Sequence, residues 1–432
     1  MRLKIVPLIV LLAINLTALG QNETKSFSLK EAQDYAIEYN KTLKNAELDV
    51  LSARKKIWET IASGLPQVDA KADYSNYLGA EMMFSFDPNM PASAIPFNPT
   101  STFSLTVSQL IFSGSYIVGL QTAKIYQQLS ETAYEKGVLT IKENVNNTYS
   151  LILVNELTRD ILKKNLANLK DTYTKTESMY SVGMVERTDV DQLSVSVNML
   201  ENQIRSADRQ VVVSYNMLRY ILGLPADTQV ELTDKLDQII EQINFTVLAS
   251  DTLNVRSNTD FRLMETQNEI AQKQVTLSKM SYLPTLAGFY QNSQKILKPK
   301  LDFSPKNVVG LNLSVPIFSS GLRKSQVDQA KIALEKSNND KALLYDNLKI
   351  EESQLRFNLN TAVEKYNSQK QNVEVADRVN KNIELKFSQG TVSSLDLTQA
   401  NNSYLAAEGD FIGATMELLK AYTSWMKLLN NL

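Results

Sequence analysis

Residues 311–321 read LNLSVPIFSSG, an alternation of apolar and polar residues that ends in glycine. From this glycine an uninterrupted helical pattern continues to Gly390. Residues 105–114 read LTVSQLIFSG, and a second helical pattern follows from there to Gly183. The interval from Gly114 to Gly183 equals the interval from Gly321 to Gly390. Two copies of equal length, with no net insertion, indicate that the length of the long helix is constrained.

The N-terminus has the three parts of a secretory signal peptide over residues 1–20. Arg2 and Lys4 form a basic region, an apolar run follows, and small residues mark a cleavage site at 18–20. A membrane anchor is the competing interpretation, and the shortness of the apolar run argues against it. No later apolar run is long enough for a membrane-spanning helix. We therefore expect an exported chain that enters a membrane, if it does so, as β-strands.

The composition excludes several classes of function. The chain has no histidine and no cysteine, which removes Ser-His-Asp and Cys-His triads, histidine-containing zinc sites and disulfides. Acidic residues slightly outnumber basic ones, and no long basic patch occurs. This balance argues against nucleic acid as a partner. No catalytic, metal-binding or cofactor-binding residue is predicted, and no cofactor.

A shorter helix is expected before each pair of strands. Ser28 and Glu31 fit a capping box, and the helix that begins there is expected to continue until Pro66 ends it. A corresponding helix is expected to begin near Asp260 and to end before Pro284. The two prolines mark the start of matching β segments.

Alternating apolar and polar residues predict two strands in each half of the chain. The expected strands lie after Pro66, before Phe112, weakly after Pro284, and over 309–315, and the strands of each pair are joined by long loops at 79–101 and 294–306. A period of two suits a strand with one face toward lipid and the other toward a wet lumen. It fits a soluble, half-buried hairpin equally well.

The long helices carry seam residues at alternating steps of four and three. They are Leu162, Leu166, Leu169, Tyr173, Thr176 and Tyr180 before the turn at Gly183, and Leu193, Val197, Leu200, Ile204, Ala207 and Val211 after it. Such stripes are typical of coiled-coil seams. A helix of this length would extend for about 100 Å at about 1.5 Å per residue, so we expect a rod or the wall of a tube.

Each long helix reverses at a glycine-containing tip. Residues 183–192 read GMVERTDVDQ, and residues 390–399 read GTVSSLDLTQ. The first glycine supplies the left-handed residue that closes a helix. Asp189 and Asp396 then lie at the start of the returning helix, where a carboxylate stabilises the exposed amides. Capping alone is the simpler interpretation of either aspartate.

The number of strands bears on the assembly. One chain supplies four strands, which cannot close a barrel, and open strand edges are not tolerated in hydrocarbon. Two chains would supply eight strands, filled inside by side chains, and three would supply twelve with a usable lumen. The residues alone do not choose between two copies and three.

The order of these features resembles the TolC-type outer-membrane efflux proteins over essentially the whole mature chain. The shared order is a signal peptide, a Ser-Leu-Lys-Glu-Ala helix, Leu-Pro, strand, loop, strand, Phe-Ser-Gly, a long helix, and a glycine tip followed by an aspartate, all repeated. The resemblance implies a mixed α and β membrane protein with two internal repeats. It implies a trimeric 12-stranded outer-membrane β-barrel, with 4 strands per chain, continued by a long α-helical coiled-coil barrel in the periplasm of a Gram-negative cell.

The domain organisation follows from the repeats. We expect a signal peptide at 1–20, a first repeat at 21–225, an equatorial connector at 226–257 and a second repeat at 258–432. Each repeat comprises a helix, two strands and a long helical hairpin. The connector has no repeat partner, and its apolar residues between Leu232 and Ile243 predict a short amphipathic helix.

The resemblance also implies a function. The chain would be a passive exit duct of a tripartite efflux or type I secretion system. Its partners would be further copies in a homotrimer, a periplasmic adaptor (membrane fusion) protein, an inner-membrane transporter of the RND or ABC type, and outer-membrane lipid. A soluble periplasmic coiled-coil scaffold or adaptor is the alternative, motivated by the same heptads. An enzyme is a third possibility, but carboxylates such as Glu351 lie on helical stretches and are explained by solvated faces.

The family's functional residues transfer to particular positions here. The acidic position at the periplasmic entrance falls on Asp189 and Asp396, which would form rings of three carboxylates in a trimer. A further position that is acidic in some members is occupied by Gln192 and Gln399. The residues at the tips, where an adaptor would dock, are Tyr180, Gly183, Val185, Phe387, Gly390 and Val392. Phe387 and Val392 also occupy the positions where some members carry an aromatic and a basic residue that latch the closed tunnel, so we expect a different latch.

Overall fold

The structure is a computed structural model that describes residues 24–85, 93–241, 243, 251–297 and 302–432. The expected signal peptide and parts of the two long loops and of the connector lie outside these residues. The chain divides into two compact units. Unit 1 comprises Met1–Ala46, Tyr134–Thr259 and Tyr345–Leu432, and unit 2 comprises Glu47–Ala133 and Asp260–Leu344. Each unit therefore contains segments from both halves of the chain.

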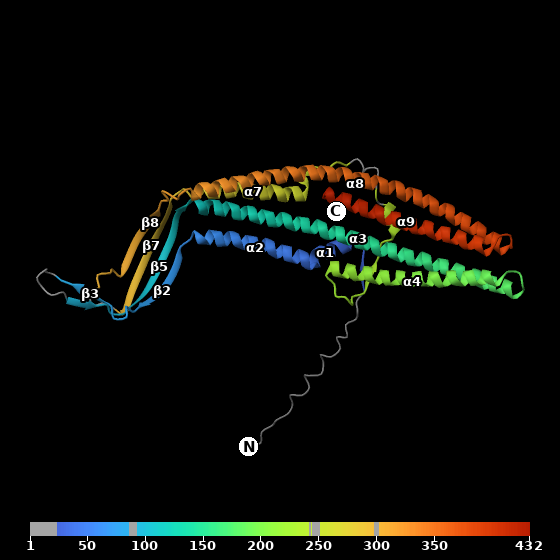
Figure 1. The fold of residues 1–432 in the computed structure, drawn as a ribbon, viewed down its shortest axis with the longest axis horizontal. Helices are drawn as coiled ribbons and strands as arrows, with labels where there is room; N and C mark the ends of the chain where they lie inside the picture. The colour runs from blue at the N-terminus through green and yellow to red at the C-terminus, as the bar shows by residue number, and fades with distance from the viewer. Residues whose placement is uncertain (1–23, 86–92, 242, 244–250, 298–301) are drawn as a thin grey trace, which may run out of the picture. The chain divides into compact units, whose positions relative to one another are not determined.

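Unit 2 contains one antiparallel sheet of four strands in the order β2-β5-β7-β8 (Figure 1). The strands are β2 (Gln67–Ser75), β5 (Thr100–Ser113), β7 (Thr285–Leu297) and β8 (Asn307–Ser314). The two strands predicted in each half are confirmed. The central pairing joins the second strand of the first repeat to the first strand of the second repeat, so β2 and β8 are the edges of this sheet.

The sheet has one mainly apolar face and one mainly polar face, although Phe289 and Val308 lie on the polar one. The register places Val68, Val107, Tyr290 and Val309 in one row across all four strands. The two edge members of this row are exposed, Val68 at 63% and Val309 at 80%. The next row, on the opposite face, contains polar residues such as Thr106 on the central strand β5. The alternation predicted from the sequence is thus realised in the sheet.

The two long loops, whose conformations the sequence pattern did not predict, are partly structured. Within 79–101 the strands β3 (Glu81–Phe84) and β4 (Ser93–Pro96) pair with each other, and β7 extends to Leu297. Strands as short as these do not show a period, and β4 ends at a proline. The sequence pattern could not distinguish this hairpin from an irregular connection.

The first helix is interrupted, which the sequence pattern did not predict. It forms α1 (Leu29–Tyr39) and α2 (Lys41–Ser63), and the predicted capping box of Ser28 and Glu31 is present. Asn40 separates the two helices with an extended conformation, φ −62° and ψ 127°. Its side-chain oxygen accepts hydrogen bonds from the amides of Thr42 (2.8 Å) and Leu43 (3.2 Å), so it caps α2. The second such helix, α7 (Thr259–Met280), is confirmed.

The doubled long helices are confirmed. They are α3 (Gly114–Ser181) with 68 residues and α8 (Leu322–Ser388) with 67 residues, followed by the returning helices α4 (Arg187–Leu222) and α9 (Ser394–Leu428). The two long helices contribute to both units. Near the tips, Leu169, Leu193 and Leu200 form a buried cluster. The predicted seam is thus packed, except that Tyr180 is 39% exposed.

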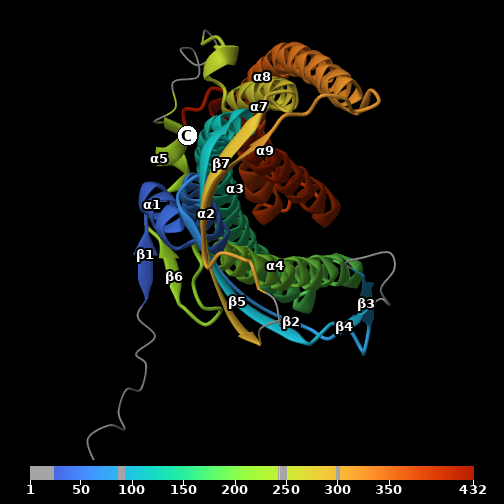
Figure 2. The same ribbon diagram turned by 90° about the vertical axis from the view of Figure 1, so that its left-hand side faces the viewer.

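The connector contains a strand that the sequence pattern did not predict. β6 (Val230–Leu232) pairs in parallel with β1 (Lys25–Phe27), and Figure 2 shows the two side by side. The predicted short helix is α5 (Leu236–Glu241), with Leu236 and Ile240 buried, and the 3-10 turn η1 (Val255–Ser257) follows. None of the helices in the described parts of the chain combines the length and the apolar character needed to cross a membrane.

Two equivalent residues of the repeats hold the connector against α3 and α8. Tyr149 on α3 is fully buried, and its hydroxyl oxygen lies 3.0 Å from both the Phe27 carbonyl and the Asp234 carboxylate. Burial raises the pKa of Tyr149, so it remains a protonated donor. Arg356 occupies the equivalent position of the second repeat, on α8, and it donates to the Asp251 carbonyl at 2.9 Å.

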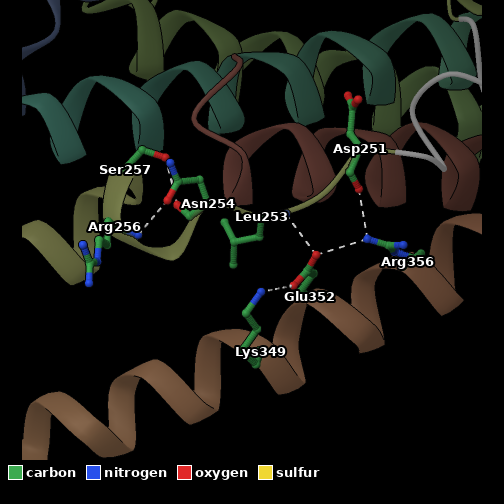
Figure 3. A network of polar contacts seen from close by, with 8 residues as sticks. All are labelled: Asp251, Leu253, Asn254, Arg256, Ser257, Lys349, Glu352 and Arg356. Atoms are coloured by element: carbon green, nitrogen blue, oxygen red, sulfur yellow. Dashed lines mark hydrogen bonds and ion pairs between the residues drawn. The ribbon is translucent and has the colours of Figure 1, made fainter.

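Figure 3 shows how Glu352 completes the second of these attachments. Its carboxylate accepts hydrogen bonds from the Leu253 amide (2.9 Å), Lys349 (3.0 Å) and Arg356 (3.1 Å), and the residue is only 8% exposed. Burial acts to raise the pKa of Glu352, but the amide and the two cations outweigh it and hold the pKa below its usual value. The buried carboxylate is therefore charged and fully paired.

We predict that Tyr149→Phe destabilises unit 1 by about 1–3 kcal/mol, because the Phe27 carbonyl and the Asp234 carboxylate lose a buried donor. The measurement is the midpoint of chemical unfolding, followed by helical circular dichroism in detergent. Tyr126→Phe is the matched control, since that side chain is 50% exposed. Equal effects of the two variants would contradict the attachment.

Candidate functional site

The two hairpin tips close with the same backbone turn. At the first tip, Gly183 has φ 75°, and its amide donates to the Tyr180 carbonyl at 2.9 Å. At the second, Gly390 has φ 69° and donates to the Phe387 carbonyl at 2.9 Å. The left-handed conformation favours glycine at both positions, as predicted. The structure therefore places the predicted tip residues in two equivalent turns.

The two aspartates cap the returning helices. Asp189 accepts a hydrogen bond from the Glu186 backbone amide at 3.0 Å. Asp396 accepts from the amide and the hydroxyl of Ser393, at 3.0 and 2.7 Å. The Ser393 hydroxyl and then its amide lower the pKa of the exposed Asp396. The capping interpretation is confirmed for both aspartates, and a carboxylate in a cap is still able to present negative charge to solvent.

A hydrogen bond joins the starts of α4 and α9. The hydroxyl of Ser394 donates to the Asp189 carboxylate, and Ser394 is only 3% exposed. Asp189 is half-buried, whereas its counterpart Asp396 is exposed. No sequence pattern indicated this contact, because serine at the start of a helix is explained by capping. The two tips of one chain are thus connected through an aspartate that was predicted for the entrance.

The remaining candidate residues divide by exposure. Gln192 and Gln399 are exposed near the starts of α4 and α9, and Val185 and Val392 are half-buried in the tip turns. Tyr180 is exposed, with its ring 5.7 Å from the guanidinium of Arg187. Its counterpart, Phe387, is only 7% exposed. Phe387 is therefore mostly buried within one chain, whereas Tyr180 is exposed.

A groove of about 760 Å³ lies above the second tip, between α3 and α8. Phe387 and Leu397 contribute apolar surface to it. Charged residues at its border include Lys175, Lys381 and Glu384. The part of the chain that the structure describes contains no group of three or more His, Cys, Asp or Glu placed to hold a metal ion. The tips present exposed surface and charged side chains, which suit the passage of solutes and the docking of a partner protein.

Comparison with known families decides the class of protein. Residues 33–224 and 254–431 match the outer membrane efflux protein family. The chain belongs to this family. The two matched segments are separated by residues 225–253.

Individual relatives of this efflux protein support the same family assignment. The outer membrane protein TolC of Salmonella enteritidis is 24% identical over 429 residues, which cover 95% of this chain and 83% of TolC. The fold is similar to the CmeC outer membrane channel of Campylobacter jejuni, with a TM-score of 0.74 and 17% identity over 93% of this chain and 85% of that one. The open MtrE outer membrane channel of Neisseria gonorrhoeae gives a TM-score of 0.74 and 17% identity over 93% of this chain and 88% of that one.

These findings establish the general function. The protein is an outer-membrane exit duct for an efflux system, with a large periplasmic part, and it belongs to a family of transport proteins. Efflux channels of this kind work with adaptor proteins and inner-membrane transporters. The alternative of a periplasmic scaffold is not favoured. The resemblance to TolC-type proteins inferred from the order of motifs is confirmed.

We predict that Asp396→Ala loosens the first turn of α9, because Ser393 loses its acceptor. The measurement is hydrogen exchange of the amides at 394–397, which should accelerate at neutral pH. In the unchanged protein the cap is fully present above the ordinary aspartate pKa and is lost as the pH falls through the lowered pKa of Asp396. Asp410→Ala, on the exposed middle of α9, should leave these amides protected. Unchanged exchange in Asp396→Ala would show that the cap contributes nothing.

Proposed function

We propose that three copies of the chain form a passive conduit across the outer membrane and the periplasm. The observation that carries this proposal is the four-stranded sheet with two open edges, β2 and β8, and an exposed apolar face. In hydrocarbon the backbone groups of such edges need partners. If β8 of one copy pairs with β2 of the next, no edge remains. Three copies then supply a 12-stranded barrel with a lumen, whereas two supply eight strands and a filled interior.

The helical hairpins extend the same wall into the periplasm. In this arrangement the repeats at 21–225 and 258–432 are the units that alternate around the ring, and the connector at 226–257 contributes to a belt around it. The doubled α3 and α8 support the proposal, since walls built from alternating repeats need helices of equal length. Aromatic residues exposed on the strands, such as Tyr74 at 64%, suit the interface with outer-membrane lipid.

The tips are the proposed site of partner docking. A periplasmic adaptor (membrane fusion) protein would contact the turns around Val185 and Val392, and an inner-membrane transporter of the RND or ABC type would supply the energy. The transporter class separates drug efflux from type I secretion. Both turns are exposed or half-buried, which supports a surface role.

The entrance is the proposed gate. Three copies would place Asp189, Asp396, Gln192 and Gln399 around one axis, with two rings of carboxylates. Such rings favour cations and repel one another when they come close. The hydrogen bond from Ser394 to Asp189 holds the two tips of each chain together, so opening would require this contact to break.

Deleting the protein should sensitise cells to toxic compounds or block export of a secreted product. The unchanged chain should restore the lost phenotype. Val185→Glu with Val392→Glu should not restore it, although trimers still form in detergent, because charge on both turns disrupts docking. If deletion has no effect and the purified protein is monomeric in detergent, the proposed conduit is wrong. Restored transport by the double variant would exclude docking at the two turns.

The gate is tested by conductance in planar bilayers. Asp189→Asn with Asp396→Asn keeps the capping acceptors but removes the charge, so cation selectivity should fall. Ser394→Ala keeps every carboxylate but removes the contact between the tips, so conductance should rise while selectivity is retained. Ser403→Ala on α9 is the control, since its hydroxyl contacts its own helix. Unchanged conductance and selectivity in both test variants would limit these residues to helix capping.

A further inference from the structure

The two repeats meet within unit 1 along α3 and α9. Lys427 on α9 forms an ion pair with Glu143 on α3 at 2.7 Å. The side chains of the pair are 35% and 20% exposed, respectively. Leu419 on α9 is 3% exposed and belongs to the same buried cluster as Val145 of α3. The seam between the repeats of one chain thus has an ion pair beside apolar packing.

The structure fixes the correspondence between the repeats at both ends of the returning helices. At the tips, Gly183 and Gly390 make the same turn. At the other ends, Gly223 (φ 73°) donates to the Tyr220 carbonyl, and Asn430 (φ 58°) donates to the Lys427 carbonyl. The interval between Gly223 and Asn430 along the chain equals that between the two tip glycines. Residues of α4 and α9 therefore correspond one to one, and α3 corresponds to α8 in the same way.

The counterparts of the two residues in the ion pair are two exposed apolar residues. The counterpart of Lys427 is Tyr220 on α4, which is 81% exposed. The counterpart of Glu143 is Ile350 on α8, which is 67% exposed. Lys427 and Glu143 carry opposite charges. Their counterparts, Tyr220 and Ile350, both present apolar surface. Within the described residues, the apolar pair is exposed, whereas the charged pair is mostly covered.

Two neighbouring positions show the same contrast. Ser150, two helical turns beyond Glu143, is 5% exposed, and its counterpart Phe357 is 65% exposed. Leu419, two turns before Lys427, is 3% exposed, and its counterpart Val212 is 58% exposed. Positions that are two turns apart lie on one side of a helix. α4 and α8 thus each carry an uncovered apolar strip where the seam within the chain is closed.

In a closed ring of alternating repeats, the contact inside a chain recurs between chains with the repeats exchanged. The contact of α3 with α9 becomes a contact of α8 with α4 of the next copy. We propose that Tyr220 and Val212 on α4 pack against Ile350 and Phe357 on α8 of a second copy of this chain. The seam between copies is then apolar where the seam within a chain has an ion pair. This inference rests on the proposed ring of copies.

The composition of the strip suits a subunit interface. Aromatic residues such as Tyr220 and Phe357 are enriched at the centres of interfaces, and charged residues are depleted there. The corresponding positions within the chain hold Lys427 and Ser150, so the two seams differ in polarity at these two positions, whereas Leu419 is apolar like its counterpart Val212. A docking surface for an adaptor is the competing use of the strip, and crosslinking distinguishes the two.

Cysteine crosslinking tests the contact cleanly, because the chain has no cysteine of its own. Tyr220→Cys with Ile350→Cys should give covalent dimers and trimers when membranes are oxidised. Glu143→Cys with Lys427→Cys should give only an internally bridged monomer. Tyr220→Cys with Leu385→Cys is the matched control, since Leu385 is an exposed apolar residue of α8 that lies far along the helix from Ile350. It should give no covalent oligomer.

A charge transplant provides the second measurement. Tyr220→Lys alone should lower the fraction of trimer in detergent at least several-fold, and adding Ile350→Glu should restore it, because the pair then reproduces Lys427 with Glu143. Absence of both the crosslink and the rescue in a protein that is otherwise trimeric would overturn the inference and leave the proposed conduit intact. If the unsubstituted protein is monomeric, both this inference and the proposed conduit are wrong. Crosslinking of Tyr220→Cys to an adaptor in place of a second copy would also overturn it.

Discussion

A strand edge in hydrocarbon leaves its backbone N–H and C=O groups without partners, and each such group costs several kcal/mol. The described sheet of unit 2 ends in two edge strands, β2 and β8, and apolar side chains on them, such as Val68 and Val309, are exposed. Because β5 pairs with β7 at the centre of the sheet, the pairing that the proposed conduit adds is the one between β8 of one copy and β2 of the next. The same incomplete seam appears along α4 and α8, whose apolar strips are uncovered.

The hairpin tips combine local stability with the proposed role in passage. Asp189 and Asp396 each complete a helix cap, which fixes where the returning helix begins. Asp189 in addition receives the Ser394 hydroxyl, whereas Asp396 is exposed and hydrogen bonds only to Ser393 in the described part of the chain. Two residues that occupy equivalent sequence positions therefore differ in surroundings.

Patterns of long period were predictable from the sequence, and contacts between distant short segments were not. Sustained alternation located β2 and β8, and the repeated spacing of Gly183 and Gly390 located the tips. The short strand β6 has no period, and its partner β1 lies at the opposite end of the first repeat. Asn40 interrupts a continuous helical pattern because its side chain satisfies the first amides of α2, an effect that propensity alone does not reveal. The burial of Phe387 and the contact of Ser394 with Asp189 likewise depend on a neighbouring hairpin.

The long helices α3 and α8 are nearly equal in length, but the seam within the chain has an ion pair where the proposed seam between copies is apolar. This difference has a physical explanation. The seam inside a chain forms between segments that are already covalently joined, so a few contacts such as the Lys427–Glu143 ion pair are enough to set its register. The proposed seam between copies would also have to compensate for the translational and rotational freedom that each copy loses on association. Buried apolar area contributes more to that free energy than a partly exposed ion pair. Two repeats with the same length and the same turns can therefore share a backbone while the residues at their two seams differ, polar where the chain holds them together and apolar at Tyr220 and Ile350 where association must do so.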